Sequence, residues 1–297
     1  MALTADPRAA QAAKAAKAAK AAPRRKHARR WHWLVLAIAL TALLLFPLYW
    51  MLVSSVDSIS SLFSVNLSLL PNFGDLGSYA EIFRNYQVGL WLVNSLVITA
   101  GSAALSIAVA VPAGYSLSRM KIGGDVAGVI MLFTRVIPGT LLVLPFFIMF
   151  SRVNLLNTLL SVIIANTSLI VPLAAWIMKG FFDRVPIDIE EAAAIDGCGL
   201  WRTFLLVAVP LVKPGIGATG IYAIVLAWSD YLFPKTLLLS PSHWTLSVGA
   251  VSLIGEHTVD WNGLMAMGTI GVLPMVLAFA VLEPYLVSGL TAGATVG

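Results

Sequence analysis

Six long apolar segments are the feature of this sequence that most constrains its fold. Each runs for about 20 residues or more, the length that an α-helix needs to cross the hydrocarbon core of a bilayer. With 59% hydrophobic and only 11% charged residues among 297, the chain carries more apolar surface than one soluble core can bury. The sequence therefore predicts an all-α polytopic membrane protein with six transmembrane helices, near residues 33–53, 88–117, 127–150, 159–178, 205–233 and 264–287.

The basic residues predict which side of the membrane each loop faces. Nine of the 19 Lys and Arg residues lie in the first 30 positions, directly before the first apolar segment, which places the N-terminus in the cytoplasm. Counted along six spans, 15 Lys and Arg residues then fall inside and three outside, with Arg135 left within the third span. The even number of spans returns the C-terminus to the cytoplasm as well.

The segment before the first span is rich in Ala and Lys. Residues 9–22 (AAQAAKAAKAAKAA) offer no apolar stripe to bury, so we expect residues 1–30 to form a solvated cytoplasmic arm. The apolar segment that follows ends in FPLYW instead of a small-residue cleavage site, which predicts a retained membrane anchor and not a signal peptide. Residues 31–297 are then expected to form the transmembrane domain.

Several chemistries are disfavoured by the composition. Beyond residue 30 the acids outnumber the bases, 13 to 10, which argues against nucleic acid as a partner. The single cysteine, Cys198, excludes an intrachain disulfide, and neither it nor the four histidines show a metal-ligand spacing. The sequence has no G-x-x-x-x-G-K-S/T phosphate loop, so this chain is expected to hold no cofactor and to leave ATP hydrolysis to a partner.

The inside segment between the fourth and fifth spans has the chemistry of a short helix with defined ends. Pro186 suits a first helical position, and the acids after it complement the positive end of a helix dipole. Gly197 can adopt the left-handed conformation that stops the helix. The sequence predicts a helix over 187–197 with a slim alanine flank that another protein's groove can approach. Two acids, Glu191 and Asp196, are available to pair with basic residues in that groove.

This segment resembles the cytoplasmic loop of the membrane-spanning subunits of type I ABC importers. That loop has the pattern E-A-A, three residues, G, nine residues, I-x-L-P. Val replaces Ile and Leu in the last part, and both changes are conservative. The matching residues are Glu191, Ala192, Ala193 and Gly197, then the nine residues 198–206, then Val207, Ala208, Val209 and Pro210.

Two further segments resemble a narrower group within that family. Residues 228–233 (WSDYLF) are similar to the W-N-E-F-L-F type segment of sugar-importer subunits. Residues 285–297 (YLVSGLTAGATVG) resemble the short cytoplasmic tail of the smaller, six-span, maltose-transporter-like permease subunit. The resemblance implies the type I ABC importer transmembrane fold and a binding-protein-dependent importer of a carbohydrate, which includes acidic glycans, in the bacterial cytoplasmic (inner) membrane.

The resemblance also implies partners and a mechanism. The expected partners are a second homologous permease subunit, two ATP-binding subunits that hold ATP and Mg, and an extracytoplasmic solute-binding protein. Closure of the ATP-binding subunits would move the 187–197 helix, within a coupling loop over 180–204, and switch the spans between inward-facing and outward-facing states. Glu191 would anchor this helix, Gly197 would set its exit angle, and Pro210 would direct the start of the fifth span. The tail over 288–297 is expected to insert against the ATP-binding subunits.

Three polar residues within or beside the spans are candidates for the substrate pathway. Arg135 lies nine residues into the third span, where a charge is costly unless it faces a polar cavity or a partner. Pro138 and Gly139 are expected to open the helix one turn later. Arg135 has two interpretations, a structural pairing or a hydrogen-bond donor to the substrate. Asn166 and Asp230 are candidates for the same cavity.

Other functions remain as alternatives. Permeases for non-sugar solutes share the coupling loop, so the sugar substrate depends on the WSDYLF and C-terminal resemblances. An ion-coupled secondary transporter would usually show acids within the membrane and internal repeats, and only Asp230 and Glu283 lie near span ends. A membrane-embedded enzyme would need polar catalytic groups that converge within the spans. Dependence of transport on a co-expressed ATPase separates the importer from the last two.

Overall fold

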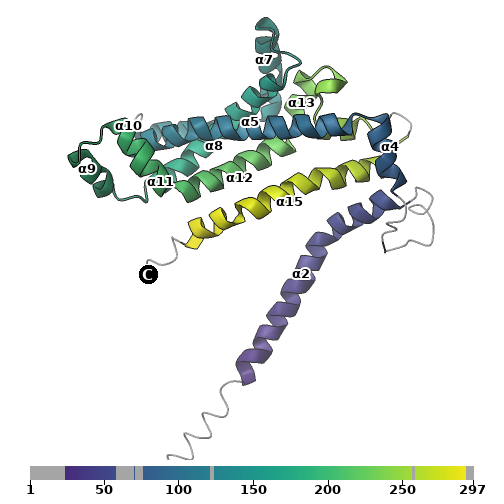
Figure 1. The fold of residues 1–297 in the computed structure, drawn as a ribbon, viewed down its shortest axis with the longest axis horizontal. Coiled ribbons are helices and arrows are strands. Elements are labelled where there is room, and N and C mark those ends of the chain that lie inside the picture. The colour runs from purple at the N-terminus through teal and green to yellow at the C-terminus, as the bar shows by residue number, and fades with distance from the viewer. Residues whose placement is uncertain (1–23, 58–69, 71–75, 121–123, 256–257, 292–297) are drawn as a thin grey trace, which may run out of the picture.

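The computed structural model describes residues 24–57, 70, 76–120, 124–255 and 258–291 of the chain. These residues are almost entirely helical, and the described part contains no strand beyond an isolated bridge between Ile254 and Val259. The long helices run along one another, with the short helix α9 (Ile187–Ile195) at one end and α4 (Gly77–Asn85) at the other (Figure 1). The two ends correspond to the inside and outside loops that the sequence predicts.

Three helices form the centre of the bundle, namely α5 (Val88–Tyr115), α8 (Leu159–Phe182) and α12 (Lys213–Ser229). They meet through small side chains, as membrane helices commonly do because small residues let backbones approach closely. A Cβ atom at Gly114 would lie 2.6 Å from the Cβ of Met178, so glycine is required where α5 crosses α8. The alanines buried in this contact are Ala103 and Ala110 of α5, Ala174 and Ala175 of α8, and Ala223 and Ala227 of α12.

Two further long helices lie outside this centre. The last helix, α15 (Trp261–Thr291), packs beside α12, and α2 (Arg24–Val56) contacts α15 but leaves the bundle toward its own N-terminal end (Figure 1). The apolar side chains of α2 are exposed from Trp31 to Tyr49. Such a surface requires lipid or another membrane helix around it. Because α2 begins at Arg24, the last residues of the segment expected as an arm continue the first span as helix.

The first, second, fourth and sixth predicted spans are present as continuous helices. They are the apolar stretches Trp31–Val56, Val88–Met120, Leu159–Phe182 and Trp261–Leu282. The predicted fifth span is a pair of helical stretches, Leu200–Leu211 and Lys213–Ser229, that meet at an angle of 76°. It counts as a fifth crossing if the bent pair is one span.

The predicted third span, over 127–150, is not one helix. It consists of α6 (Gly124–Phe133), the 3-10 turn η2 (Thr134–Val136) and α7 (Gly139–Arg152). The break falls at Ile137, whose ψ of 116° is extended, because a proline at the next position disfavours the α-helical conformation of the residue before it. The expected opening at Pro138 and Gly139 is thus confirmed. It is a complete break, and the 14 residues of α7 are short for a crossing helix.

The end of the molecule opposite α9 is closed by short helices that are tied to the bundle. They are α4, α13 (Leu232–Leu237), η4 (Pro241–His243) and α14 (Leu246–Val251). The indole nitrogen of Trp91 donates to the carbonyl oxygen of Pro241 at 2.7 Å, and the Asn94 amide donates to the carbonyls of Ser242 and Trp244 at 3.0 Å each. These bonds fix the segment from Pro241 to Trp244 to the start of α5.

Candidate coupling site

The predicted docking helix is present and ends where the sequence places its stop. Helix α9 spans Ile187–Ile195, and Asp196 is its C-cap. Pro186 is at the N-cap position with an extended ψ of 132°, one residue before the first helical position that the sequence predicted for it. Gly197 has a φ of +85°, which confirms the left-handed stop. The N–H groups of Cys198 and Gly197 donate to the carbonyls of Ala193 (2.9 Å) and Ala194 (3.0 Å), the paired bonds of a Schellman motif. The regular helix is therefore two residues shorter than 187–197.

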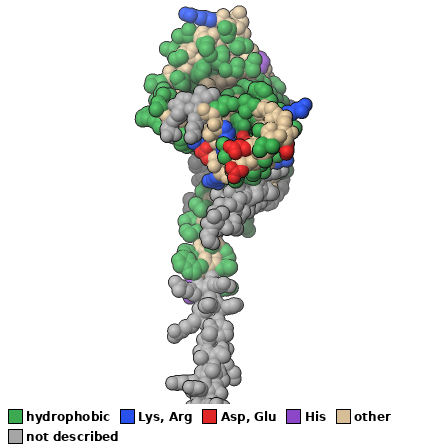
Figure 2. Space-filling model, turned by 90° about the vertical axis from the view of Figure 1, so that its left-hand side faces the viewer, with side chains coloured by type: hydrophobic (Ala, Val, Ile, Leu, Met, Phe, Trp, Pro, Cys, Tyr) green, Lys and Arg blue, Asp and Glu red, His purple; other side chains and the backbone are tan. Residues whose placement is uncertain are grey.

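The outer face of α9 combines acids with apolar side chains. Figure 2 looks at the end of the molecule where α9 lies and shows acidic side chains gathered there, with Lys and Arg beside them. Glu191, Ala192 and Asp196 are exposed and Ala193 is half-buried, so the motif residues are accessible to a partner. Exposed isoleucines lie on the same helix, and the most exposed is Ile195 at 87%.

The residue that holds α9 against the bundle is Glu190, which sequence reasoning did not single out. It is buried, and its Oε1 accepts a hydrogen bond from Nε of Arg119 at 2.7 Å while its Oε2 accepts one from the hydroxyl of Tyr115 at 2.8 Å. Arg119 also donates from Nη2 to the carbonyl of Val185 at 2.8 Å. A signal was available, because adjacent acids at 190 and 191 lie about 100° apart around a helix, so only one of them can face the bundle.

A second ion pair lies nearby at the end of α8. Nζ of Lys179 is 2.7 Å from Oδ2 of Asp183, and the hydroxyl of Ser118 donates to Oδ1 of Asp183 at 2.6 Å. Partial burial of Asp183 acts to raise the pKa of its carboxyl, but the hydrogen bonds from Lys179 and Ser118 outweigh it, so the pKa lies below its usual value. Asp183 is therefore ionised at neutral pH.

The chain that follows α9 enters the fifth span through irregular helix. It forms α10 (Leu200–Thr203), the π-helical turn η3 (Phe204–Ala208) and α11 (Val209–Leu211) before the bend into α12. Pro210 lies in α11 and is exposed. It has no N–H to donate to the preceding turn, which suits it to a place where the regular bonding pattern is interrupted.

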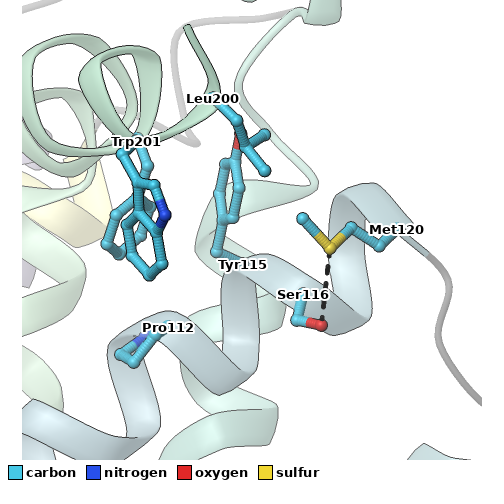
Figure 3. Close-up of a pocket in the computed structure, with 7 residues that line it drawn as sticks. Pro112, Tyr115, Ser116, Met120, Leu200 and Trp201 are labelled. Carbon is cyan, nitrogen blue, oxygen red and sulfur yellow. Dashed lines mark hydrogen bonds between the residues drawn. The ribbon is translucent and has the colours of Figure 1, made fainter.

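A cavity of about 210 Å³ separates this segment from the end of α5 (Figure 3). On the α5 side the helix continues as a second π-helical turn, η1 (Ser116–Met120). The centroids of the Tyr115 and Phe204 rings lie 4.8 Å apart, so the two rings are in contact. π-helical turns are rare and frequently occur at functional sites, and two of them lie at this cavity. The lining residues are Pro112, Tyr115, Ser116, Met120, Leu200, Trp201 and Phe204.

The candidate pathway residues Asn166 and Asp230 lie together at another cavity, of about 150 Å³, between α8 and α12. Oδ1 of Asp230 accepts hydrogen bonds from the backbone N–H groups of Leu232 (3.0 Å) and Phe233 (3.4 Å) and so caps α13. The Asn166 amide is close enough to the Asp230 carboxylate to interact electrostatically. Nevertheless, Asn166 Nδ2 and Asp230 Oδ2 form no regular hydrogen bond within the described part of the chain. Both atoms are buried and lie near one another in this structure.

The structure describes the remaining candidate residues only in part. Arg135 lies in the η2 turn, and its side chain is outside the described part, so its role stays a prediction. Helix α15 continues to Thr291, which covers the start of the predicted tail over 288–297, whereas residues 292–297 and the arm over 1–23 lie outside the described residues.

The sequence matches a known family over most of its length. Residues 103–291 match the family described as "Binding-protein-dependent transport system inner membrane component". The chain is 32% identical to the inner membrane ABC transporter permease protein YcjP of Escherichia coli, over 85% of this chain and 91% of that protein. It is 34% identical to the maltodextrin transport system permease protein MdxG of Bacillus subtilis, over 75% of this chain and 81% of that protein.

A further relative and a solved structure are also similar to this chain. The sulfoquinovosyl glycerol transport system permease protein SmoH of Agrobacterium fabrum is 32% identical, over 85% of this chain and 89% of that protein. A chain in the crystal structure of a bacterial ABC transporter involved in the import of the acidic polysaccharide alginate superposes with a TM-score of 0.73 at 22% identity, over 87% of this chain and 97% of that chain. That likeness confirms the predicted fold class, the type I ABC importer transmembrane fold. The chain is a multi-pass membrane protein that belongs to the family of binding-protein-dependent transport system inner membrane components.

Proposed function

We propose that this chain is a permease subunit of an ATP-driven importer that moves a carbohydrate across the bacterial cytoplasmic membrane by alternating access. The observation that carries the proposal is the coupling motif on an exposed, sharply terminated helix at one end of a membrane bundle. Glu191, Ala192 and Asp196 face outward there, and Gly197 stops the helix in a left-handed conformation. Such a helix is suited to docking in a groove of a cytoplasmic partner.

The proposed assembly contains a second homologous permease, two ATP-binding subunits and an extracytoplasmic solute-binding protein. The exposed apolar face of α2, from Trp31 to Tyr49, supports the presence of lipid and of a partner permease around this chain. ATP and Mg would be held by the ATP-binding subunits, because this sequence lacks a phosphate loop. In this arrangement α9 and both termini face the cytoplasm, in agreement with the excess of Lys and Arg on that side.

A carbohydrate substrate is supported by the relatives and by the second cavity. Two relatives at 32–34% identity are named as permeases for maltodextrin and for sulfoquinovosyl glycerol. At the cavity between α8 and α12, the Asn166 amide can donate a hydrogen bond and the Asp230 carboxylate can accept one. A sugar hydroxyl both donates and accepts, so the pair matches it. Arg135, if it faces the same path, adds a donor for hydroxyls or for the carboxylate of an acidic glycan.

ATP-dependent uptake by the reconstituted complex tests this function. In proteoliposomes with the binding protein and a labelled oligosaccharide outside and the ATP-binding subunits facing the lumen, the complete assembly should accumulate the oligosaccharide only when ATP is enclosed in the lumen. A screen of the binding protein against sugars, polyols and acidic glycans selects the oligosaccharide. Uptake that continues without ATP and stops when an ion gradient is collapsed would show an ion-coupled carrier instead.

A further inference from the structure

We propose that Arg119 and Glu190 are positioning residues that form the mechanical link through which movement of α9 reaches the membrane helix α5. The inference rests on the proposed function, since it takes α9 as the element that an ATP-binding subunit moves. In this proposal, a buried ion pair within this chain transmits the movement of α9 to the membrane-spanning helices.

Helix α9 is attached to the bundle in an unusual way, and this attachment supports the proposal. Within α9, all of which the structure describes, Glu190 is the only buried residue. The helix has three isoleucines, but Ile187, Ile189 and Ile195 are all exposed. Helix α9 is thus held to the bundle by an acid instead of by an apolar face, which is the usual means for a short helix. Apart from its covalent ends and its contacts with α10 and η3, α9 is attached to the bundle through this carboxylate.

The contacts of the pair make it a stiff connection. The two side chains are 13% (Arg119) and 9% (Glu190) exposed, and Nε lies 2.7 Å from Oε1. Tyr115 occupies the other carboxylate oxygen, and the carbonyl of Val185 accepts from the guanidinium. At this burial, loss of one partner leaves the other charge without compensation. The geometry therefore penalises any movement of α9 that leaves Arg119 behind.

The receiving end of the link is irregular helix. Arg119 lies in the π-helical turn η1, and Tyr115 is the last residue of α5. The Tyr115 ring packs on the rings of Phe182 in α8 and Phe204 in η3, with centroid distances of 5.3 Å and 4.8 Å. Movement of Glu190 is thus delivered to the place where α5, α8 and the entry to α12 meet, beside the cavity in Figure 3. Two π-helical turns lie at that place, and such turns are among the usual sites at which helices kink.

The second ion pair provides a matched control. Lys179 and Asp183 are also 2.7 Å apart, but their side chains are 24% and 42% exposed, and neither lies on α9. Asp183→Asn removes this ion pair at the same end of the molecule and keeps the direct contact between Arg119 and Glu190. The amide oxygen that Asp183→Asn introduces can still accept from Ser118, the hydroxyl to which Arg119 donates at 3.4 Å. Such exposed pairs contribute little to stability, so the complex should tolerate the change.

The test uses the complete complex in proteoliposomes, with the loaded binding protein present or absent. Glu190→Gln and Arg119→Gln each place an amide that can still hydrogen-bond across the pair, so complex yield and basal ATPase should stay within about twofold of the unaltered complex. Each should reduce the stimulation of ATPase by the loaded binding protein, and uptake, by about tenfold. The exchange of the two residues, Arg119→Glu with Glu190→Arg, should recover part of the stimulation. Asp183→Asn should behave like the unaltered complex.

Two results would overturn the link. Normal stimulation in both single variants would show that α9 is coupled by another route. A parallel fall of yield, basal ATPase and stimulation, with no recovery in the exchanged pair, would show that the ion pair only supports the fold. Absence of ATP-dependent uptake in the unaltered complex would instead refute the proposed function, and the link with it.

Discussion

Asn166 and Asp230 lie 64 positions apart in the sequence and line the same cavity, one from α8 and the other from the end of α12. Asp230 uses one carboxylate oxygen to cap α13, and its other oxygen has no hydrogen-bond partner among the described residues. The helix cap can therefore be kept while the charge is removed, because asparagine is as good a helix cap as aspartate. The same side chain can thus be altered without loss of the helix start.

Asp230→Asn should keep the cap and lose the charge. We expect the complex to assemble and hydrolyse ATP while the KM for uptake rises about tenfold, the loss expected for one hydrogen bond to a charged group. Asp230→Ala is the comparison, since it removes the cap as well and should reduce thermal stability. Saturation curves for labelled oligosaccharide measure the effect. An unchanged KM in Asp230→Asn would remove this residue from the pathway.

Gly197 should tolerate asparagine and reject valine. Its Cβ position is open, with no atom within 4 Å, so any defect comes from the φ of +85° and not from a clash. Asparagine accepts the left-handed conformation, whereas it costs other residues about 1–2 kcal/mol and is worst for β-branched ones. We expect Gly197→Val to abolish uptake and stimulated ATPase and Gly197→Asn to retain them. Equal behaviour of the two variants would contradict a role for the exit angle of α9.

Glu191→Lys tests the outward face of α9. Because Glu191 is exposed, the change should not disturb the fold, and the protein should remain in the membrane at normal levels. Reversal of the charge should nevertheless abolish uptake and substrate-stimulated ATPase through repulsion in the partner's groove. Membrane fractionation and ATPase assays on the same preparation measure both effects. Normal stimulation in this variant would show that Glu191 does not contact the partner.

Arg135→Met separates the two interpretations of Arg135. A residue of the pathway should lose uptake while the complex still assembles and hydrolyses ATP. A structural residue should lose assembly, because its removal leaves a polar partner unpaired within the membrane. Co-purification of the partner permease, measured beside uptake, distinguishes the two. Full uptake by the variant would exclude both.

The C-terminal tail can be tested by two deletions. Removal of residues 288–297 should impair assembly or regulation of the ATPase, because the tail is expected to reach the ATP-binding subunits. Removal of residues 292–297 alone preserves all of α15, which ends at Thr291, and isolates the part beyond the helix. Complex yield and turnover are the measurements. If the longer deletion leaves both unchanged, the tail has no such contact.

The sequence predicted the fold class and the presence of helix α9 because both depend on local patterns. Apolar runs of sufficient length, and the sequence from Pro186 to Gly197, carry their own structural meaning. The break at Ile137 was foreseen only as a local opening, since a proline in a membrane helix can kink it or end it, according to what the neighbouring helices supply. Glu190 was missed because its partners, Arg119 and Tyr115, lie more than 70 positions away, and one sequence does not show such a contact.

A cross-linking measurement tests the central claim, that α9 is the element docked on the ATP-binding subunits. In a Cys198→Ser background, a photoreactive thiol label at Ala192→Cys lies on the exposed flank of α9. The same label at Ser252→Cys lies at the opposite end of the molecule, just after α14. The label at 192 should produce a covalent adduct with an ATP-binding subunit in the assembled complex, and the label at 252 should not. An adduct from 252, or none from 192 in a complex that is active before illumination, would contradict the account.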